Sequence, residues 1–263
     1  MIKCYSHQDV ERWGEYSGDR NRVHFDRSVA IKNGFDDVIV QGMLVLLDAK
    51  ISLAPFIKKD CSLNFYIKKP VYINEEIEHF IKQQSNKTTL IVSSVKERAD
   101  VRVTAAILSK KRPEVDAARD GMQVSPEFVQ GYLDVLAKYY PYITDAWVKM
   151  DTLLFFIAFN QQKDDYFYRQ AQKVERNGNN DDITTFHVAQ HLYVSERLLQ
   201  HNNIDICSMS FIVYEEDVYI NDDSAYSNFN IIVSEGSEII FQSSIGCLTK
   251  MMRYGWEEDH KEF

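Results

Sequence analysis

The sequence predicts an α+β fold built from two similar halves. In the first half, an apolar helical run at 41–53 precedes several segments in which hydrophobic and polar residues alternate. The second half repeats this order, with an apolar run at 146–159 followed by further strand-like segments. A helix that is apolar on all sides is buried, and a strand with period-two alternation buries one face. We therefore expect an antiparallel sheet to wrap a long central helix in each half.

The chain before the first apolar run is expected to form two short helices around a loop. Residues 7–16 have helical spacing of their apolar side chains and end near Gly18. Residues 19–24 contain Asp and Asn without any periodicity, which is typical of a loop. Residues 26–32 form the second short helix, which an Asn-Gly pair ends.

The main helix of the first half is expected at 41–53, with Pro55 ending it. The period-two pattern begins after Cys61, and polar or turn-forming residues interrupt it between strands. The predicted strands are 63–67, 77–83, 88–96 and 102–108.

A polar, proline-containing segment separates the halves. It predicts a first domain at 1–112, a linker at 113–126 and a second domain at 127–263. The predicted helices and strands of the second domain are helices 132–140 and 146–159 and strands 186–194, 206–214, 229–233 and 239–248.

Composition excludes several classes of protein. The chain has 263 residues, of which 45% are hydrophobic, enough for a sizeable core. A net charge of −9 makes nucleic acid a poor partner. We expect no membrane span and no secretory leader, because long apolar runs are missing from the sequence. The four scattered cysteines lack metal-ligand spacing, so we predict a reduced cytoplasmic protein without a metal site.

Two neighbouring stretches carry the predicted chemistry. Asp19 and His24 place a carboxylate and an imidazole five residues apart in one loop. Downstream, Gln41-Gly42-Met43 opens the main helix, and a helix start offers unpaired N–H groups to a polarised carbonyl. An acid, a base and an oxyanion donor are the minimum set for adding or removing water beside a carbonyl.

These residues also carry a family resemblance. The segment SGDRNRVH at 17–24, followed by AIKNGF and by VQGM at the start of the main helix, resembles the hydratase-2 signature of MaoC-like dehydratases. The resemblance extends from about residue 11 to residue 111 and includes LNF at 63–65 and KPVY at 69–72. It implies a hot-dog fold, here as a double hot-dog, and an activity on (R)-3-hydroxyacyl and trans-2-enoyl thioesters.

The resemblance assigns roles to individual residues. It implies that Asp19 and His24 are the catalytic acid–base pair and that the backbone N–H of Gly42 binds the thioester carbonyl. Asn21 would fix the loop or help to hold the water. Gln41 and Met43 are further candidate substrate-binding residues at the helix start, and Met43 is also expected to pack in the helix core. No cofactor is implied, because the acid–base pair and the helix start suffice.

The second half has no counterpart of the SGDRNRVH loop, and its helix begins Asp145-Ala146-Trp147 without a glycine. We therefore expect it to be a structural partner for the first half. The other histidines are read as structural or exposed, and His187 and His191 are expected on a strand and not in a metal site.

Three functions remain open from the sequence. The dehydratase or hydratase reading is favoured by the SGDRNRVH loop, and its partner would be an acyl thioester of coenzyme A or acyl carrier protein. A hot-dog thioesterase would use the same helix start, and a catalytically silent acyl-binding or scaffold subunit is suggested by Arg22 and Gln41, where the family usually has proline and histidine. Whether the chain also forms a homodimer is left open.

Overall fold

The structure, a computed structural model, describes residues 1–85, 87–109, 126–160, 166–174, 183–200, 209–221 and 224–251. Most of the predicted linker (113–125) lies outside the described residues, as do Cys207, His201 and His260. The predicted domain borders therefore stay predictions.

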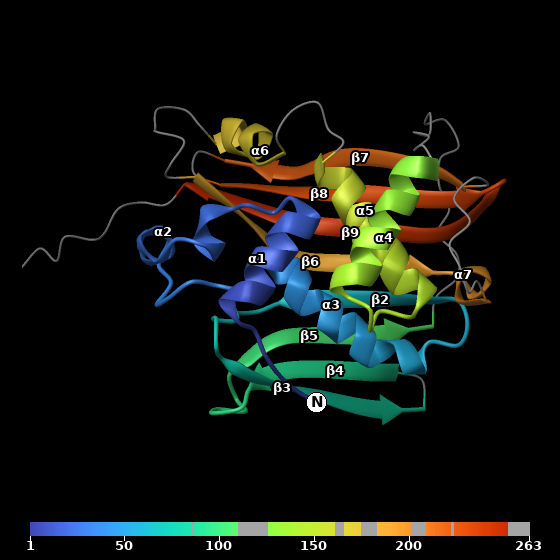
Figure 1. Ribbon diagram of the computed structural model, residues 1–263, viewed down its shortest axis with the longest axis horizontal. Helices are drawn as coiled ribbons and strands as arrows, with labels where there is room; N and C mark the ends of the chain where they lie inside the picture. The colour runs from blue at the N-terminus through green and yellow to red at the C-terminus, as the bar shows by residue number, and fades with distance from the viewer. Residues whose placement is uncertain are drawn as a thin grey trace, which may run out of the picture.

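One antiparallel sheet runs through both halves (Figure 1). Its strand order is β1-β3-β4-β5-β2-β6-β9-β8-β7. The strands are β1 (Ile2–Cys4), β2 (Cys61–Ile67), β3 (Glu76–Gln84), β4 (Lys87–Ser94), β5 (Val101–Leu108), β6 (Ile183–Val194), β7 (Met209–Ile220), β8 (Ser224–Glu235) and β9 (Glu238–Met251). The two sheets expected from the sequence are thus joined edge to edge, through the antiparallel pair β2–β6 in which Leu63 lies opposite Leu192.

The strand order shows that the halves repeat one topology about the β2–β6 junction. Moving outward from the junction, the first half has β2-β5-β4-β3 and the second has β6-β9-β8-β7. In each half the innermost strand follows the main helix and pairs with the last strand of that half. This order and the single central helix per half confirm the predicted α+β double hot-dog.

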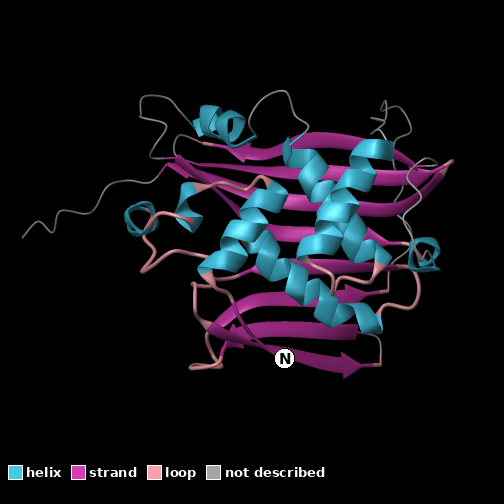
Figure 2. Ribbon diagram, in the orientation of Figure 1, coloured by secondary structure: helices cyan, strands magenta, loops and turns pink. Residues whose placement is uncertain are grey.

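The main helices lie together on one face of the sheet (Figure 2). The helices are α1 (His7–Ser17), α2 (Arg27–Lys32), α3 (Gly42–Leu53), α4 (Pro126–Tyr139), α5 (Ala146–Asn160), α6 (Tyr166–Val174) and α7 (Glu196–Gln200), with 3-10 turns at Arg22–His24 and Ala54–Phe56. Trp13, Leu46, Leu154 and Phe229 belong to one continuous hydrophobic core. The halves therefore share this core, and a smaller separate cluster contains Tyr193, Ile232 and Ile239 of the second half.

A buried ion pair crosses between the two central helices. Lys50 of α3 and Asp151 of α5 are 1% and 2% exposed, and their Nζ and Oδ2 atoms are 2.5 Å apart. Gln190 of β6 donates from Nε2 to the other carboxylate oxygen of Asp151 at 2.7 Å and to Ser243 Oγ at 2.9 Å. The pair is thus embedded in a hydrogen-bonded network that connects both halves.

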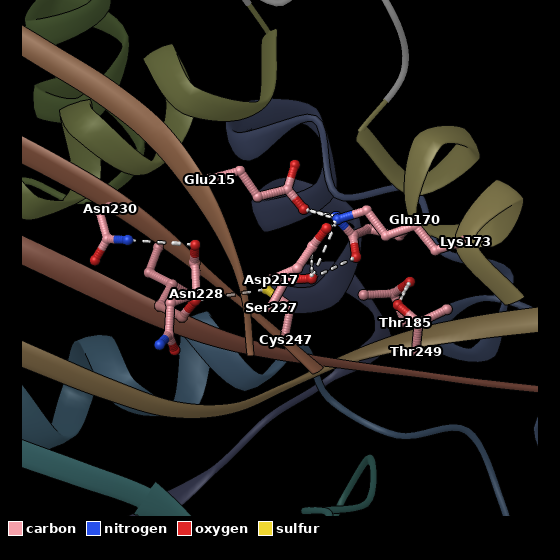
Figure 3. Close-up of polar contacts among 11 residues, drawn as sticks. Gln170, Lys173, Thr185, Glu215, Asp217, Ser227, Asn228, Asn230, Cys247 and Thr249 are labelled. Atoms are coloured by element: carbon pink, nitrogen blue, oxygen red, sulfur yellow. Dashed lines mark hydrogen bonds and ion pairs between the residues drawn. The ribbon is translucent and has the colours of Figure 1, made fainter. Parts of the chain in front are cut away.

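The structure also contains elements that the sequence patterns did not predict. The loop at 19–24 closes into a 3-10 turn, and β1, α6 and α7 are additional. Helix α6 is held on the sheet by Lys173, which binds Glu215 and Asp217 of β7 and lies 3.2 Å from Ser227 Oγ of β8 (Figure 3). The sequence of α6 is strongly amphipathic, so its helical periodicity was present locally, and its place on the sheet depends on these distant partners.

Candidate active site

The loop after α1 holds Asp19 in a fixed, buried position. Gly18 ends α1 with a φ of 77°, a left-handed conformation that glycine adopts without a steric cost. The Asp19 N–H then donates to Ser17 Oγ at 3.1 Å, and Asp19 Oδ1 accepts from the Asn21 N–H at 3.3 Å. Asp19 is 1% exposed. Its Oδ2 atom is directed toward His24.

The neighbouring contacts of His24 determine which of its ring nitrogens can accept a proton. Nδ1 lies 2.9 Å from the carbonyl oxygen of Ile39. Because a carbonyl oxygen only accepts hydrogen bonds, Nδ1 carries the proton and Nε2 of the neutral ring keeps its lone pair. Nε2 lies 3.8 Å from Asp19 Oδ2, too far for a direct hydrogen bond. One water oxygen could lie within hydrogen-bond distance of both atoms.

The start of α3 is the third part of the site. The N–H groups of Leu44 and Val45 bond to the Gln41 carbonyl, and Gln41 makes no side-chain bond that caps the helix. The N–H of Gly42 thus belongs to the first turn, where helix N–H groups lack intrahelical acceptors. A Cβ at Gly42 would meet Ile67 Cδ1 at 2.8 Å, so glycine allows the helix start to pack closely against β2.

A cavity of about 370 Å³ brings these groups together. Asp19, His24 and Gly42 all line it. The remaining walls come from both halves and are largely apolar: Asn33, Phe35, Ile39, Val40, Val45, Ile67, Lys68, Lys69, Pro70, Val71, Val103, Thr185, Phe186, His187, Val188, Leu248 and Lys250. The cavity has the size of a small-molecule site and places few polar groups among apolar ones.

The second half takes a larger part in this cavity than the sequence predicted. Residues 185–188 of β6 and Leu248 of β9 form one wall. Asn21 connects the loop at 19–24 to that wall, since its Nδ2 donates to the Thr185 carbonyl at 3.0 Å. The expected structural partner therefore also lines the candidate site.

Three predicted binding residues have side chains outside the cavity lining. Asn21 fixes the loop through Thr185, as described above. Gln41 is fully buried, and its Nε2 donates to the Val10 carbonyl at 3.0 Å. Met43 is 1% exposed within the core. Their contribution to substrate binding stays a prediction, since the structure gives each a packing contact.

Arg22, which stands where the resemblance leads one to expect proline, lies on the solvent side of the loop. Its side chain is 63% exposed, and Nη2 lies 3.1 Å from Asp26 Oδ2. It is not among the residues that line the cavity. The geometry fits a solvated loop residue.

Sequence reasoning missed His187, which it read as structural or exposed. The residue lines the cavity together with Asp19 and His24. Burial lowers the pKa of its imidazole to about 4; the charge of Asp19 opposes the shift, and the charges of His24 and Lys50 add to it. His187 is therefore neutral at pH 7. Its position on a strand was predicted, but its neighbours follow from the tertiary fold alone.

Three lysines line the cavity from its exposed side. Lys68 and Lys69 follow β2, and Lys250 is near the end of β9. All three are exposed, and Lys69 Nζ is 2.7 Å from Asp100 Oδ1. Asp100 balances the charge of Lys69, and Lys68 and Lys250 add positive charge to the cavity lining of an otherwise acidic chain.

The corresponding position in the second half differs chemically. The Asp145 carbonyl accepts the first N–H bonds of α5. Asp145 also lines a separate depression, together with Glu196 and Lys58. The described residues that line this depression include no histidine. A carboxylate at the helix start also opposes the binding of developing negative charge. Which half carries the chemistry stays a prediction.

Two other site types have no counterpart in the described part of the chain. Among these residues, no group of three or more His, Cys, Asp or Glu side chains is placed to hold a metal ion. Within the same ranges, no helix is both long enough and apolar enough to span a membrane.

Part of the chain is similar in sequence to a curated protein. A curated relative, the mitochondrial 3-hydroxyacyl-[acyl-carrier-protein] dehydratase of Arabidopsis thaliana, is 36% identical over 81 residues, which are 28% of this chain and 46% of the relative. The chain thus spans less than half of the length of that relative. No family model matches the chain.

Solved structures with similar folds include both dehydratases and thioesterases. An (R)-hydratase from A. caviae is 21% identical, with a TM-score of 0.30 over 41% of this chain and 88% of that one. A MaoC-like dehydratase is 9% identical, with a TM-score of 0.46 over 97% and 96%. The acyl-CoA thioesterase II of Mycobacterium marinum is 12% identical, with a TM-score of 0.46 over 84% and 91%. The fold assignment rests on the strand order given above. By its topology, its loop motif and its curated relative, the chain is a double hot-dog protein that resembles the MaoC-like dehydratases.

Proposed function

We propose that this protein interconverts (R)-3-hydroxyacyl and trans-2-enoyl thioesters by adding or removing water. The observation that carries the proposal is the cavity that holds Asp19, His24 and the Gly42 end of α3 together. Asp19 Oδ2 and His24 Nε2 are 3.8 Å apart, so both can bind one water. The apolar walls suit an acyl chain.

In the hydration direction, the thioester carbonyl accepts a hydrogen bond from the Gly42 N–H. That bond stabilises the negative charge that develops on the carbonyl oxygen when the double bond is attacked. The water oxygen forms its bond to C3, and the Asp19–His24 pair carries the released proton to C2. The elements of one water are added in full, and dehydration is the same sequence reversed.

The substrate's carrier is proposed to be coenzyme A or acyl carrier protein, whose pantetheine arm bears phosphate. The exposed Lys68, Lys69 and Lys250 at the cavity support this choice, because positive charge attracts phosphate groups. A solvated attraction of this kind weakens with salt. We expect the KM for a coenzyme A thioester to rise with ionic strength.

The test follows trans-2-enoyl absorbance and free thiol with crotonyl-coenzyme A as the probe. Loss of enoyl absorbance without thiol release supports hydration. Release of thiol instead would assign the protein to the hot-dog thioesterases, and binding without either change would make it a silent acyl-binding subunit. Both of the latter results contradict the proposal.

Variants of the acid–base pair complete the test. Asp19→Asn keeps an oxygen for the Asn21 N–H, so the loop should stay folded, and His24→Ala removes the Nε2 base. Each should lower turnover by about 10²–10⁴-fold. Asp37→Asn, at an exposed carboxylate outside the cavity lining, is the matched control and should leave the rate unchanged. Retention of more than about a tenth of the wild-type rate by either site variant would contradict the assignment.

A further inference from the structure

A β-bulge interrupts β6 at the point where this strand passes the candidate site. The register of the β6–β9 pair shifts between His187 and Ala189, so Val188 is the extra residue. A bulge bends the strand and re-aims its side chains, and bulges are frequent beside active sites. Here four consecutive residues, 185–188, line the cavity, although a regular strand would present every second side chain.

His187 is brought next to the start of α3 by this arrangement. A Cβ built on Gly42 would lie 3.5 Å from the His187 carbonyl oxygen and 3.6 Å from its Cβ. The imidazole packs edge-on against Phe155 of α5, with ring centroids 5.4 Å apart. His187 of the second half thus lines the same cavity as Gly42, its Cβ lies beside the start of α3, and its ring packs against α5.

We propose that His187 is a substrate-binding residue supplied by the second half, whose imidazole N–H donates a second hydrogen bond to the thioester carbonyl. This inference rests on the proposed function of the site. A neutral imidazole always has one N–H donor, and the low pKa of His187 keeps the ring neutral at pH 7. Two donors that converge on one oxygen make an oxyanion hole. The second half would then supply part of the chemistry as well as a wall.

The inference is tested with two substitutions at one position. His187→Phe keeps a ring that packs against Phe155 and removes both nitrogens, whereas His187→Gln keeps a side-chain N–H. We expect His187→Phe to lower kcat/KM for crotonyl-coenzyme A hydration by about 10²–10³-fold, the usual effect of losing one oxyanion-hole donor. The kcat/KM of His187→Gln should be at least about tenfold higher than that of His187→Phe. His191→Phe, four residues along the same strand and outside the cavity lining, should have the wild-type rate.

A spectroscopic readout separates donation from packing and from failure of the proposed function. The infrared carbonyl stretch of ¹³C-labelled crotonyl-coenzyme A is recorded when bound to Asp19→Asn protein with and without His187→Phe. Hydrogen bonding lowers this frequency, so we expect a smaller shift in the His187→Phe protein. This arm needs thioester binding but no turnover, and it therefore still tests His187 if the wild type proves inactive.

Several results would overturn the inference. A folded His187→Phe protein with kcat/KM within about threefold of wild type lacks the expected donor effect. Equal loss in His187→Phe and His187→Gln would indicate that ring packing matters and hydrogen bonding does not. An unchanged carbonyl frequency would exclude the hydrogen bond, even if the chain hydrates crotonyl-coenzyme A as proposed.

Discussion

Replacing Lys50 by Met should strongly destabilise both halves at once. Lys50 and Asp151 are 1% and 2% exposed, and their charged atoms are 2.5 Å apart. Burial lowers the pKa of Lys50, while the charge and hydrogen bond of Asp151 oppose that shift. Without its partner, Asp151 would keep a buried charge with the Gln190 N–H as its remaining described hydrogen bond. Such a loss typically costs about 3–5 kcal/mol.

This free energy corresponds to a large thermal effect. For a chain of this size, 1 kcal/mol shifts the Tm by about 2–4 °C, so we expect a fall of about 6–20 °C. The assay is unfolding at pH 7, by heating for the Tm and by urea for the free energy of unfolding. Both are followed by the fluorescence of Trp13 in α1 and Trp147 in α5, which are each 1% exposed. Because Lys50 and Asp151 lie on helices of different halves, the signal should report one shared transition.

The double variant Lys50→Met/Asp151→Leu distinguishes a buried charge from lost packing. Replacing both partners removes the uncompensated charge, and Gln190 keeps Ser243 Oγ at 2.9 Å as an acceptor. Most of the stability should therefore return. Arg98→Met is the control, because its pair with Glu78 is 70% and 25% exposed and should contribute less than about 1 kcal/mol. A Lys50→Met cost below about 1 kcal/mol, or additive single and double effects, would refute the reasoning.

Three further predictions concern the loop, the acid stability and the helix start. Arg22→Pro should leave turnover unchanged and raise the free energy of unfolding by up to about 1 kcal/mol, because the ψ of Asn21 is 124°, which suits a following proline. A raised KM at low salt would instead place Arg22 at the substrate. Burial, then the N-terminus and Lys3, lower the pKa of His79 from 6.5 to about 4. Between these two values the unfolded chain binds a proton that the folded chain does not, so the free energy of unfolding falls by up to about 3 kcal/mol as the pH drops through this window. In His79→Gln the urea midpoint should depend less on pH. A pH dependence as steep as that of the wild type would contradict this prediction. Gly42→Ala should lower kcat/KM on the order of 10²-fold by misplacing the thioester carbonyl. The Tm should change little, because the flexible end of the Ile67 side chain can move. An unaffected rate would show that the substrate does not approach Gly42.

The sequence by itself determined the local elements and the motif. The helix at 42–53 was expected because it is apolar on every side, and its observed start, Gly42, differs by one residue from the predicted one. The four strands of the first half after Cys61 appeared as period-two alternation, and the observed strands extend or end within one or two residues of the predicted ranges. The short spacing of Asp19 and His24 made their proximity a local property of the loop.

Only the tertiary structure decided how the two halves meet and what completes the site. The β2–β6 pairing uses backbone hydrogen bonds, which any residue can make, so no side-chain pattern indicated a continuous sheet. The Lys50–Asp151 pair joins residues on helices about a hundred positions apart, and each residue alone reads as a polar interruption of an apolar helix. His187 lies far along the chain from His24, and the bulge that directs it into the cavity depends on its register with β9. The motif half of the site was therefore readable from local spacing, whereas the contribution of the second half arises from long-range strand pairing that the sequence does not display.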